Sequence, residues 1–198
     1  EAAKVANVDI PTLCYMKNVS KTGSCRMCVV ELKGGRKLEA ACVYPVSEGM
    51  EVLTHSPKVK EARKSTLELL LSNHDRKCLT CVRNKNCELQ TLAFDYDVDQ
   101  DKFGKNKVEY AIDSSSPYIV RDDNKCIMCR RCTAVCKNVQ GIGAIGEIAR
   151  GYNVHVGCAF EKDLADAPCV GCGQCRVVCP TGAITIKSNV HEVWNALA

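Results

Sequence analysis

The sequence predicts an α+β fold divided into several small domains, and three observations support this prediction. Sixteen of the 198 residues are Cys, a share close to that of cysteine-built scaffolds. Aromatic residues make up only 5% of the chain, with a single Trp, so no large aromatic core is expected. The Cys residues lie in closely spaced runs between short helical and strand-like segments. Ligand binding to such runs contributes folding free energy that apolar burial does not supply.

Residues 1–54 are predicted to form a β-rich domain with one short helix at its start. A strand is expected over the sequence CVVEL at 28–32, and its partner is expected over 36–41. Gly34 and Gly35 would form the turn between these two strands. A further strand is expected over 50–53.

Residues 55–94 are predicted to form a small helical domain. Ser56 followed by Pro57 is typical of a helix start, because Ser caps free N–H groups and Pro suits the first helical turn. The helix should end near 72–73, and a Cys-rich loop should separate it from a second helix over 88–94. The residues expected on the apolar stripe of the first helix are Val59, Ala62, Thr66, Leu69 and Leu70.

The rest of the chain divides into a linker, a domain with an internal repeat, and a tail. Residues 95–116 are polar and without periodicity, so we expect a linker that crosses the surface over 95–107. Residues 117–186 contain the repeat: CIMCRRCTAVCKNVQGIGAI matches CVGCGQCRVVCPTGAI in all four Cys and in the closing Gly-Ala-Ile. Residues 187–198 are expected to be helical and to begin the connection to a further domain that this sequence does not contain.

Charge and hydropathy argue against several classes of protein. The formal net charge is +4, but Lys and Arg are scattered and form no basic patch with aromatic residues, so nucleic-acid binding is not expected. No apolar stretch approaches the roughly 20 residues that span a bilayer, and no signal peptide is recognisable. The opening EAAKVAN is typical of the middle of a helix, so we expect that residues before Glu1 are missing.

Disulfides are one alternative for so many Cys residues. Cys residues two or three positions apart converge more readily on one metal centre than they pair with each other, and secreted disulfide scaffolds are usually shorter than this chain. Thiolate ligands suit a reducing compartment, so a cytoplasmic location is expected.

Each copy of the repeat has the spacing C-x2-C-x2-C-x3-C. In two-cluster ferredoxins, three Cys of such a run bind one [4Fe–4S] cluster and the fourth binds the other. The spacing therefore predicts two clusters with crossed ligands. One set is Cys126, Cys129, Cys132 and Cys179, and the other is Cys136, Cys169, Cys172 and Cys175. Pro180 follows Cys179 as in the ferredoxin run, whereas Lys137 after Cys136 departs from it; zinc sites, the alternative, use separated C-x2-C pairs.

Four further Cys residues in the first domain have the spacing C-x10-C-x2-C-x13-C. They are Cys14, Cys25, Cys28 and Cys42. Plant-type [2Fe–2S] domains use C-x4-C-x2-C with a distant fourth Cys, so the match is partial. Gly23 would allow backbone N–H groups to approach the sulfur atoms. We expect a [2Fe–2S] cluster here, with a four-thiolate zinc site as the alternative.

The helical domain contains the spacing H-x3-C-x2-C-x5-C, formed by His74, Cys78, Cys81 and Cys87. The three Cys residues lack a fourth ligand unless His74 supplies it, so we expect a [4Fe–4S] cluster with one imidazole and three thiolate ligands. A neutral imidazole in place of a thiolate should raise the reduction potential of that cluster. A structural zinc with the same four ligands and a three-Cys cluster without His74 are the alternatives.

These assignments use fifteen of the sixteen Cys residues and leave Cys158. We expect Cys158 to be a non-ligand packed between the two copies of the repeat, because unligated Cys behaves as a small hydrophobic residue. The predicted cofactors are one [2Fe–2S] cluster and three [4Fe–4S] clusters, and iron is the only metal expected.

The order of these motifs resembles the N-terminal relay region of [FeFe] hydrogenases and that of NAD-dependent formate dehydrogenase catalytic subunits. The large subunit of respiratory complex I shares the first two elements. The stretches CRRCTAVCKNVQGIGAI, CVGCGQCRVVCPTGAI and VHEVWNALA are most similar to multimeric NAD(P)-linked [FeFe] hydrogenases, including electron-bifurcating ones. The resemblance implies a plant-type-ferredoxin-like [2Fe–2S] domain, a small helical [4Fe–4S] domain and a bacterial two-cluster ferredoxin-like domain.

The resemblance also implies an electron relay inside a larger enzyme. The relay would be branched or linear. Electrons would pass between an H-cluster in a catalytic domain beyond Ala198 and the two ferredoxin-like clusters, then reach the His74 and [2Fe–2S] clusters, and leave to a partner subunit. A hetero-oligomer is implied, with a flavin- and NAD(P)-binding diaphorase-type subunit and a small [2Fe–2S] subunit; soluble ferredoxin is a further candidate partner. Residues 1–198 alone are expected to carry no substrate-converting site.

Other functions remain open. One is the relay of a formate dehydrogenase that contains molybdenum or tungsten, and a second is a free-standing polyferredoxin, which the unfinished C-terminal helix disfavours. A third is a zinc-binding interaction protein, which only the zinc content would support.

Overall fold

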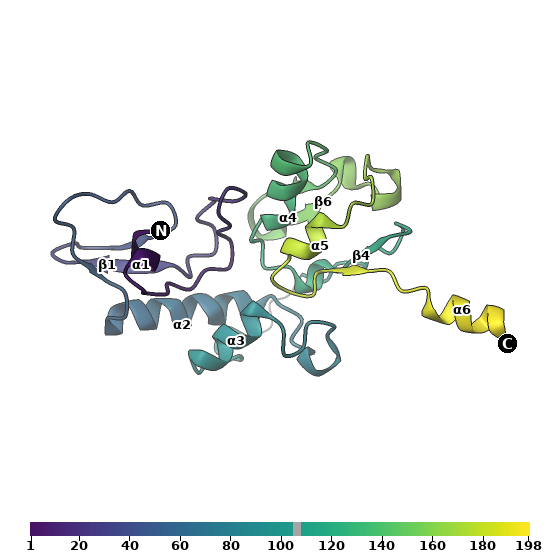
Figure 1. Ribbon diagram of the computed structural model, residues 1–198. Helices are drawn as coiled ribbons and strands as arrows, with labels where there is room; N and C mark the ends of the chain where they lie inside the picture. Colours follow the sequence, from purple (N-terminus) through teal and green to yellow (C-terminus); the bar gives the residue numbers. More distant parts are fainter. Residues whose placement is uncertain (105–107) are drawn as a thin grey trace.

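The computed structural model describes residues 1–104 and 108–198, and Figure 1 shows their arrangement. The N-terminal sheet lies above the long helix α2 (Pro57–Ser72), and the repeat-containing domain lies beside both. The part of the expected linker at 105–107 lies outside the described residues. Helices and strands are mixed throughout, as the α+β prediction requires.

The first domain contains a short helix α1 (Ala2–Val5) and a three-stranded antiparallel sheet in the order β2-β1-β3. Its strands are β1 (Val29–Leu32), β2 (Leu38–Ala40) and β3 (Val52–Leu53). The turn between β1 and β2 contains Gly34 at a φ of +78°, a conformation that glycine adopts without steric cost. The predicted hairpin is confirmed, with strands shorter than expected.

Helix α2 begins as predicted, because the Ser56 Oγ accepts a hydrogen bond from the Val59 N–H at 3.3 Å. The predicted apolar stripe is partly wrong, since Leu69 is 56% exposed. The buried residues of α2 are Val59, Arg63, Leu67, Glu68 and Leu71. Arg63 interrupted the apolar pattern, yet it is fully buried and donates to the Val29 carbonyl oxygen at 2.8 Å and to the Tyr96 hydroxyl at 3.1 Å. These hydrogen bonds offset part of the desolvation cost of the guanidinium, whose buried Nε has no hydrogen-bond partner among the described residues.

The predicted second helix is α3 (Glu88–Asp95), and a short 3-10 turn (Cys78–Thr80) lies in the loop before it. Leu89 anchors α3 in the core beneath α2. Lys102, after α3, donates to the buried carboxylate of Glu68 at 2.6 Å and so fastens the following segment to α2.

The repeat-containing domain is built from two similar halves. Strand β4 (Ile119–Arg121) pairs antiparallel with β7 (Ile184–Ile186), and β5 (Gly146–Ile148) pairs with β6 (His155–Gly157). Each Cys run leads into a helix, α4 (Arg131–Ala134) with a π-helical extension (Val135–Val139) in the first copy and α5 (Gln174–Val178) in the second. Further single 3-10 turns are Asp123–Lys125, Gly151–Asn153, Ala159–Glu161 and Leu164–Asp166.

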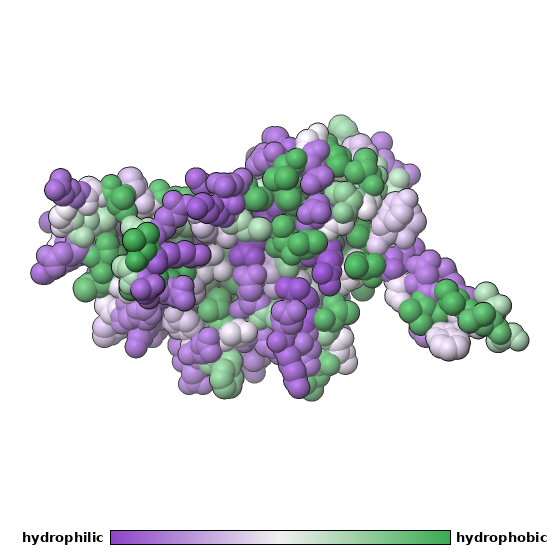
Figure 2. Space-filling view, in the orientation of Figure 1, coloured by the Kyte–Doolittle hydropathy of each residue, from purple (hydrophilic) through white to green (hydrophobic). Residues whose placement is uncertain are grey.

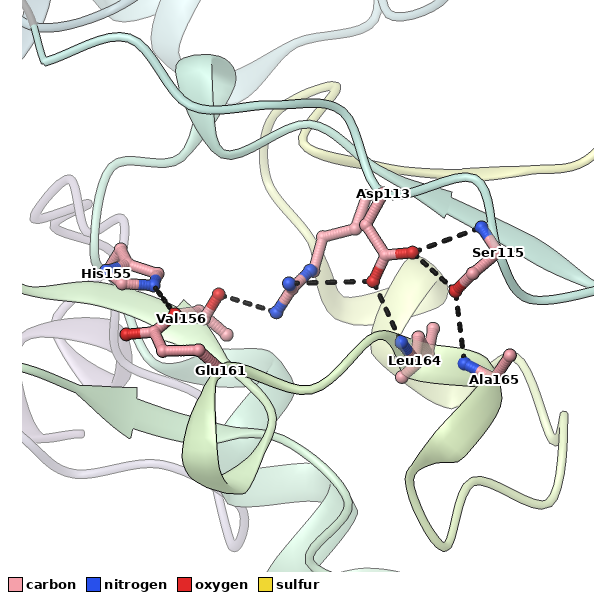
Figure 3. A network of polar contacts seen from close by, with 8 residues as sticks. Asp113, Ser115, His155, Val156, Glu161, Leu164 and Ala165 are labelled. Atoms are coloured by element: carbon pink, nitrogen blue, oxygen red, sulfur yellow. Dashed lines mark hydrogen bonds and ion pairs between the residues drawn. The ribbon is translucent and has the colours of Figure 1, made fainter.

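A polar network fastens the segment before β4 to the insertion between the two copies (Figure 3). Arg121 donates to the Val156 carbonyl oxygen at 2.7 Å and lies 3.6 Å from the Asp113 carboxylate. That carboxylate also accepts from the Leu164 N–H at 3.0 Å and from Ser115. These hydrogen bonds hold the Asp113 pKa below its ordinary value, although desolvation by burial raises it. The end of the segment expected to be a linker therefore packs against the repeat-containing domain.

The expected helix near the C-terminus is α6 (Val190–Leu197), which projects away from the rest of the chain (Figure 1). Hydrophobic side chains lie along its exposed surface (Figure 2), among them Val193, Trp194 and Leu197. Within 1–104 and 108–198, every helix is too short or too polar to cross a bilayer.

Candidate iron–sulfur centres

Four of the predicted ligands gather at one cavity in the repeat-containing domain, which we call the inner site. They are Cys126, Cys129, Cys132 and Cys179. Cys126 and Cys129 precede α4, Cys132 lies in α4, and Cys179 directly follows α5 in the other copy. Cys129, Cys132 and Cys179 are 5–7% exposed. The crossed arrangement that the repeat predicts is therefore present in the placement of these side chains.

The other four gather at a second cavity, which we call the outer site. They are Cys136, Cys169, Cys172 and Cys175. Ile119 and Leu164 line the same cavity together with Gln140 and Gln174, so its wall is apolar only in part. Cys172 is exposed, whereas no Cys of the inner site is. The two sites share a spacing but differ in their access to solvent.

Burial raises the pKa of these thiols. The pKa of Cys126 is raised to about 12, and those of Cys129 and Cys175 to about 11, chiefly by desolvation. Neighbouring candidate ligands add to the rise. Free thiols at these positions would therefore be protonated at neutral pH, and iron would have to displace those protons on binding.

The four Cys residues of the first domain form two close pairs. Cys25 lies beside Cys14, and Cys28 lies beside Cys42. Cys14, Cys25 and Cys28 are at most 4% exposed. The neighbouring Cys25 thiol, which can donate a hydrogen bond, lowers the pKa of Cys14 to about 4, whereas desolvation raises that of Cys42 to about 12. Two pairs of thiols suit a cluster with two iron atoms, each bound by two protein ligands.

The predicted ligands of the helical domain also lie near one another, and we call them the His74 site. His74, Cys78 and Cys87 line one cavity beside α2 and α3. Desolvation raises the pKa of Cys78, and the nearby Cys87 and Cys81 thiols raise it further. Cys81 does not line this cavity but is a neighbour of Cys78, so one imidazole and three thiols lie in one region. Their assignment as one ligand set stays a prediction.

The donor chemistry and its spacing fit iron–sulfur clusters. Among the residues that the structure describes, no three His, Cys, Asp or Glu side chains converge closely enough to bind a single metal ion. A tetrahedral zinc site with Zn–S bonds of about 2.3 Å would bring its sulfur atoms to roughly 3.8 Å from one another. Donor groups spread around a cavity instead suit a cofactor several atoms across.

The inner site borders both neighbouring sites. Cys129 lies close enough to Cys14 for their charges to interact, and both belong to one buried cluster of side chains. On another side, the Cys87 Sγ lies 3.6 Å from the carbonyl oxygen of Pro180, the residue after Cys179. The inner and outer sites are joined because Cys132 and Cys175 are electrostatic neighbours.

Arg131 is a residue near the inner site that the sequence did not single out. It lies between Cys129 and Cys132, is 7% exposed, and forms a two-point ion pair with Glu88 at 2.8 and 3.0 Å. Its backbone N–H and its charge both lower the pKa of Cys129, which desolvation raises. The paired Arg residues of CRRC were the available signal, but nothing in the sequence distinguished the buried Arg131 from the more exposed Arg130.

The leftover thiol lies in the core of the repeat-containing domain. Cys158 is 1% exposed and packs in the same apolar cluster as Cys132, Cys179 and Ile184. Its expected position between the two copies is confirmed.

Comparison with known proteins identifies three iron–sulfur domain families along the chain. Residues 1–57 match the family described as a 2Fe-2S iron-sulfur cluster binding domain. Residues 63–102 match the NADH-ubiquinone oxidoreductase-G iron-sulfur binding region, and residues 116–185 match the ferredoxin-like domain of NADH-quinone oxidoreductase subunit 3. The chain thus contains both [2Fe–2S] and [4Fe–4S] domains.

Similar proteins are subunits of redox enzymes. The chain is 44% identical over 203 residues to the NADP-reducing hydrogenase subunit HndD of Solidesulfovibrio fructosivorans, which covers all of this chain and 35% of that protein. It is 40% identical over 185 residues to a G-type NADH-quinone oxidoreductase subunit of Rhizobium meliloti, which covers 92% of this chain and 21% of that protein. This chain therefore spans about a fifth to a third of these relatives.

A solved structure has the same fold. The crystal structure of an NAD+-reducing [NiFe]-hydrogenase in the H2-reduced state includes a chain that matches with a TM-score of 0.87 and 29% identity. The match covers 94% of this chain and 79% of that one. In sequence and in fold, the chain is similar to the iron–sulfur regions of an NADP-reducing hydrogenase subunit, of a G-type NADH-quinone oxidoreductase subunit and of an NAD+-reducing [NiFe]-hydrogenase.

Proposed function

We propose that this chain is the electron relay of an [FeFe] hydrogenase and that it binds one [2Fe–2S] and three [4Fe–4S] clusters. The [2Fe–2S] ligands are the two Cys pairs of the first domain, and the [4Fe–4S] ligands are those of the His74, inner and outer sites. The identity of 44% to an NADP-reducing hydrogenase subunit, over all of this chain and 35% of that protein, supports the hydrogenase assignment.

The observation that carries the proposal is the adjacency of the four donor sets. Cys14 of the first domain belongs to the same buried cluster as Cys129, and the Cys87 Sγ of the His74 site lies 3.6 Å from the Pro180 carbonyl oxygen beside the inner site. The outer site adjoins the inner site through the packed helices α4 and α5. This adjacency supports a branched relay in which the inner site is the junction.

The bound clusters supply one-electron redox chemistry, and the chain supplies spacing, shielding and electrostatics. Ile119 and Leu164 give the outer cavity apolar lining on the side of the core, whereas Cys172 is exposed to solvent. Arg131 places a buried positive charge beside the inner site, where it stabilises negative charge on a reduced centre.

We assign the boundaries of four functional segments from the positions of the Cys motifs. The [2Fe–2S] domain is 1–54, the His74 domain is 55–94, the linker is 95–116 and the two-cluster domain is 117–186. The family matches over 1–57, 63–102 and 116–185 support this division. Residues 187–198 would begin the connection to a catalytic domain that holds the H-cluster.

The working enzyme in this proposal is a cytoplasmic hetero-oligomer. Its partners are a flavin- and NAD(P)-binding diaphorase-type subunit and a small [2Fe–2S] subunit, with soluble ferredoxin as a further electron carrier. The description of several relatives as subunits of NAD(P)-linked enzymes supports a multi-subunit assembly.

A second candidate is the corresponding relay of a G-type NADH-quinone oxidoreductase subunit, which the 40% identity to such a subunit favours. A formate dehydrogenase relay remains the other alternative on the order of the motifs. All three use the same arrangement of clusters within this chain, so the metal content and the hydrogen turnover of the whole enzyme distinguish them. About 14 iron atoms per chain, with no further metal and no hydrogen turnover, would favour the relay of an NADH-quinone oxidoreductase.

The test is the metal content of the native full-length protein, purified anaerobically with its partner subunits. The four clusters account for about 14 iron atoms per chain. Iron beyond that number without molybdenum, tungsten or nickel is the expected result, together with hydrogen turnover. Molybdenum or tungsten would favour a formate dehydrogenase, and nickel a [NiFe] enzyme. About one zinc with some four fewer iron atoms would refute the assignment of the His74 site.

A further inference from the structure

The His74 site and the inner site meet along residues 179–182, which we call the bridge segment. Cys179 is a candidate ligand of the inner site, and Pro180 follows it directly. The Pro180 carbonyl oxygen lies 3.6 Å from the Sγ of Cys87, a candidate ligand of the His74 site. A single peptide unit therefore separates a ligand of one site from a contact with a ligand of the other.

Gly182 makes a second contact across the same boundary. A Cβ atom at Gly182 would lie only 2.7 Å from the Cys81 Sγ, whereas non-bonded heavy atoms settle near 3.5–4.0 Å. Any side chain at this position would therefore push Cys81 away by about 1 Å or deform its loop. The φ angle of Gly182 is not positive, so its lack of a side chain serves this close approach and not a special backbone conformation.

Buried hydrogen bonds hold the bridge segment in place. Thr181 is 2% exposed, and its hydroxyl donates to the Lys125 carbonyl oxygen at 2.8 Å. The same hydroxyl lies 3.7 Å from the Cys179 Sγ. The segment is therefore fixed to the inner site on one side while it touches the His74 site on the other.

Two interactions clamp the boundary at residues next to the candidate ligands. Glu88, which follows Cys87, forms the two-point ion pair with Arg131, the residue before Cys132. The Asp75 N–H, next to His74, donates to the Asn124 carbonyl oxygen at 2.7 Å. Both interactions involve residues adjacent to candidate ligands. They therefore restrict movement of the His74 site relative to the inner site.

We infer that the bridge segment, held by the Glu88–Arg131 pair, sets the separation of the His74 and inner sites, and that Gly182 is its positioning residue. This inference rests on the relay function proposed above. In the step that it serves, one electron lost at one site is gained at the other, and no bond forms or breaks. The rate of that step depends on the separation that Gly182 permits.

The test compares Gly182→Ala with Gly146→Ala in the full-length enzyme complex. Gly146 lies in the same domain, lacks a positive φ and has open space where a Cβ would be placed, so it is a matched control. Iron per chain and the EPR signal of each cluster establish that both variants are loaded. The spin coupling between the two signals, and their equilibration rate by rapid freeze-quench EPR, are then measured.

We expect Gly182→Ala to keep its iron and both signals, to show weaker spin coupling, and to equilibrate several-fold more slowly. Gly146→Ala should match the wild type in every readout. Unchanged coupling and rate in a loaded Gly182→Ala variant would overturn the inference. Wild-type protein without either signal would instead overturn the relay function on which the inference rests.

If Gly182→Ala loses iron, a second variant tests the same inference. Glu88→Gln keeps the shape of the side chain but removes the charge that pairs with Arg131. We expect weaker spin coupling in this variant with both clusters retained. Coupling equal to that of the wild type would refute the role of the clamped boundary.

Discussion

The inner and outer sites have the same Cys spacing but different surroundings. In the inner site, Cys129, Cys132 and Cys179 are nearly inaccessible, because the first domain and the His74 domain pack against that side. In the outer site, Cys172 is exposed, and the neighbouring Val170 and Val177 are also exposed. Solvent access is one of the factors that set cluster potentials, so equal ligand sets do not imply equal redox behaviour.

The backbone of the two copies is alike where the Cys spacing demands it. Met128 and Arg130 in the first copy have positive φ values of 52° and 62°, and Gly171 and Gly173 in the second have 66° and 72° at the corresponding positions. A left-handed conformation costs a residue with a side chain roughly 1–2 kcal/mol and costs glycine little. The comparison shows that the placement of the Cys side chains around a cavity requires positive φ angles at these two positions. The requirement holds whether glycine or a residue with a side chain occupies them.

The largest expected effect comes from removing the crossed ligands one at a time. Cys179→Ala and Cys136→Ala should each reduce the iron content by about four atoms per chain, because each removes one ligand of a [4Fe–4S] cluster. Only Cys179→Ala should stop electron transfer between the [2Fe–2S] and His74 sites, since only the inner site is the junction.

Iron analysis and freeze-quench EPR measure both effects. Cys158→Ala is the matched control, because Cys158 is buried nearby and is not expected to be a ligand. Iron loss in that variant would show that the ligand assignment is wrong.

The inner and outer sites should lose iron to a chelator at different rates, because their exposure to solvent differs. In the reconstituted chain 1–198, the outer cluster should lose its iron several-fold faster than the inner one, because Cys172 is accessible and the inner thiols are not. Iron release over time, with the EPR signals of the remaining clusters, checks the order. Simultaneous loss from both sites would mean that exposure does not distinguish them.

Arg131→Gln should shift the inner cluster alone. The loss of a buried positive charge beside the site disfavours the added electron, so the reduction potential should fall by roughly 30–60 mV. Potentiometric titration followed by EPR measures it. Arg130→Gln is the control, because its side chain is 42% exposed and pairs with the partly exposed Glu147, so solvent screens its charge. An equal shift in both variants would contradict a specific role for Arg131.

The smallest expected effects concern the shared backbone. Gly173→Ala should destabilise the chain by about 1–2 kcal/mol, because φ is +72° there and the space around the position is open. Arg130→Gly should stabilise the chain. It loses the weak surface ion pair with Glu147, but the backbone strain that it relieves at a positive φ is larger. The thermal midpoint of cluster loss should move by about 2–4 °C per kcal/mol. Shifts of the same sign in both variants would contradict the common backbone requirement.

The sequence predicted several elements because local rules decide them. The Ser56 cap, the glycine turn after β1 and the crossed Cys runs depend on residues within a few positions or on a fixed spacing. The buried face of α2 was not fully predicted, since Arg63 and Glu68 are buried only through partners that are distant in sequence. The role of 113–116 was missed for the same reason, because their hydrogen bonds reach Arg121, Leu164 and Ala165.

The sequence by itself determined which cysteines form each candidate ligand set, because that information lies in their spacing and in the repeat. Only the tertiary structure decided which site is buried, which sites touch, and where Gly182 meets Cys81. The physical reason is that spacing constrains the chain over a few residues, whereas exposure and separation depend on domains packed together across the whole chain. The ion pair of Glu88 and Arg131, 43 residues apart, is one such contact.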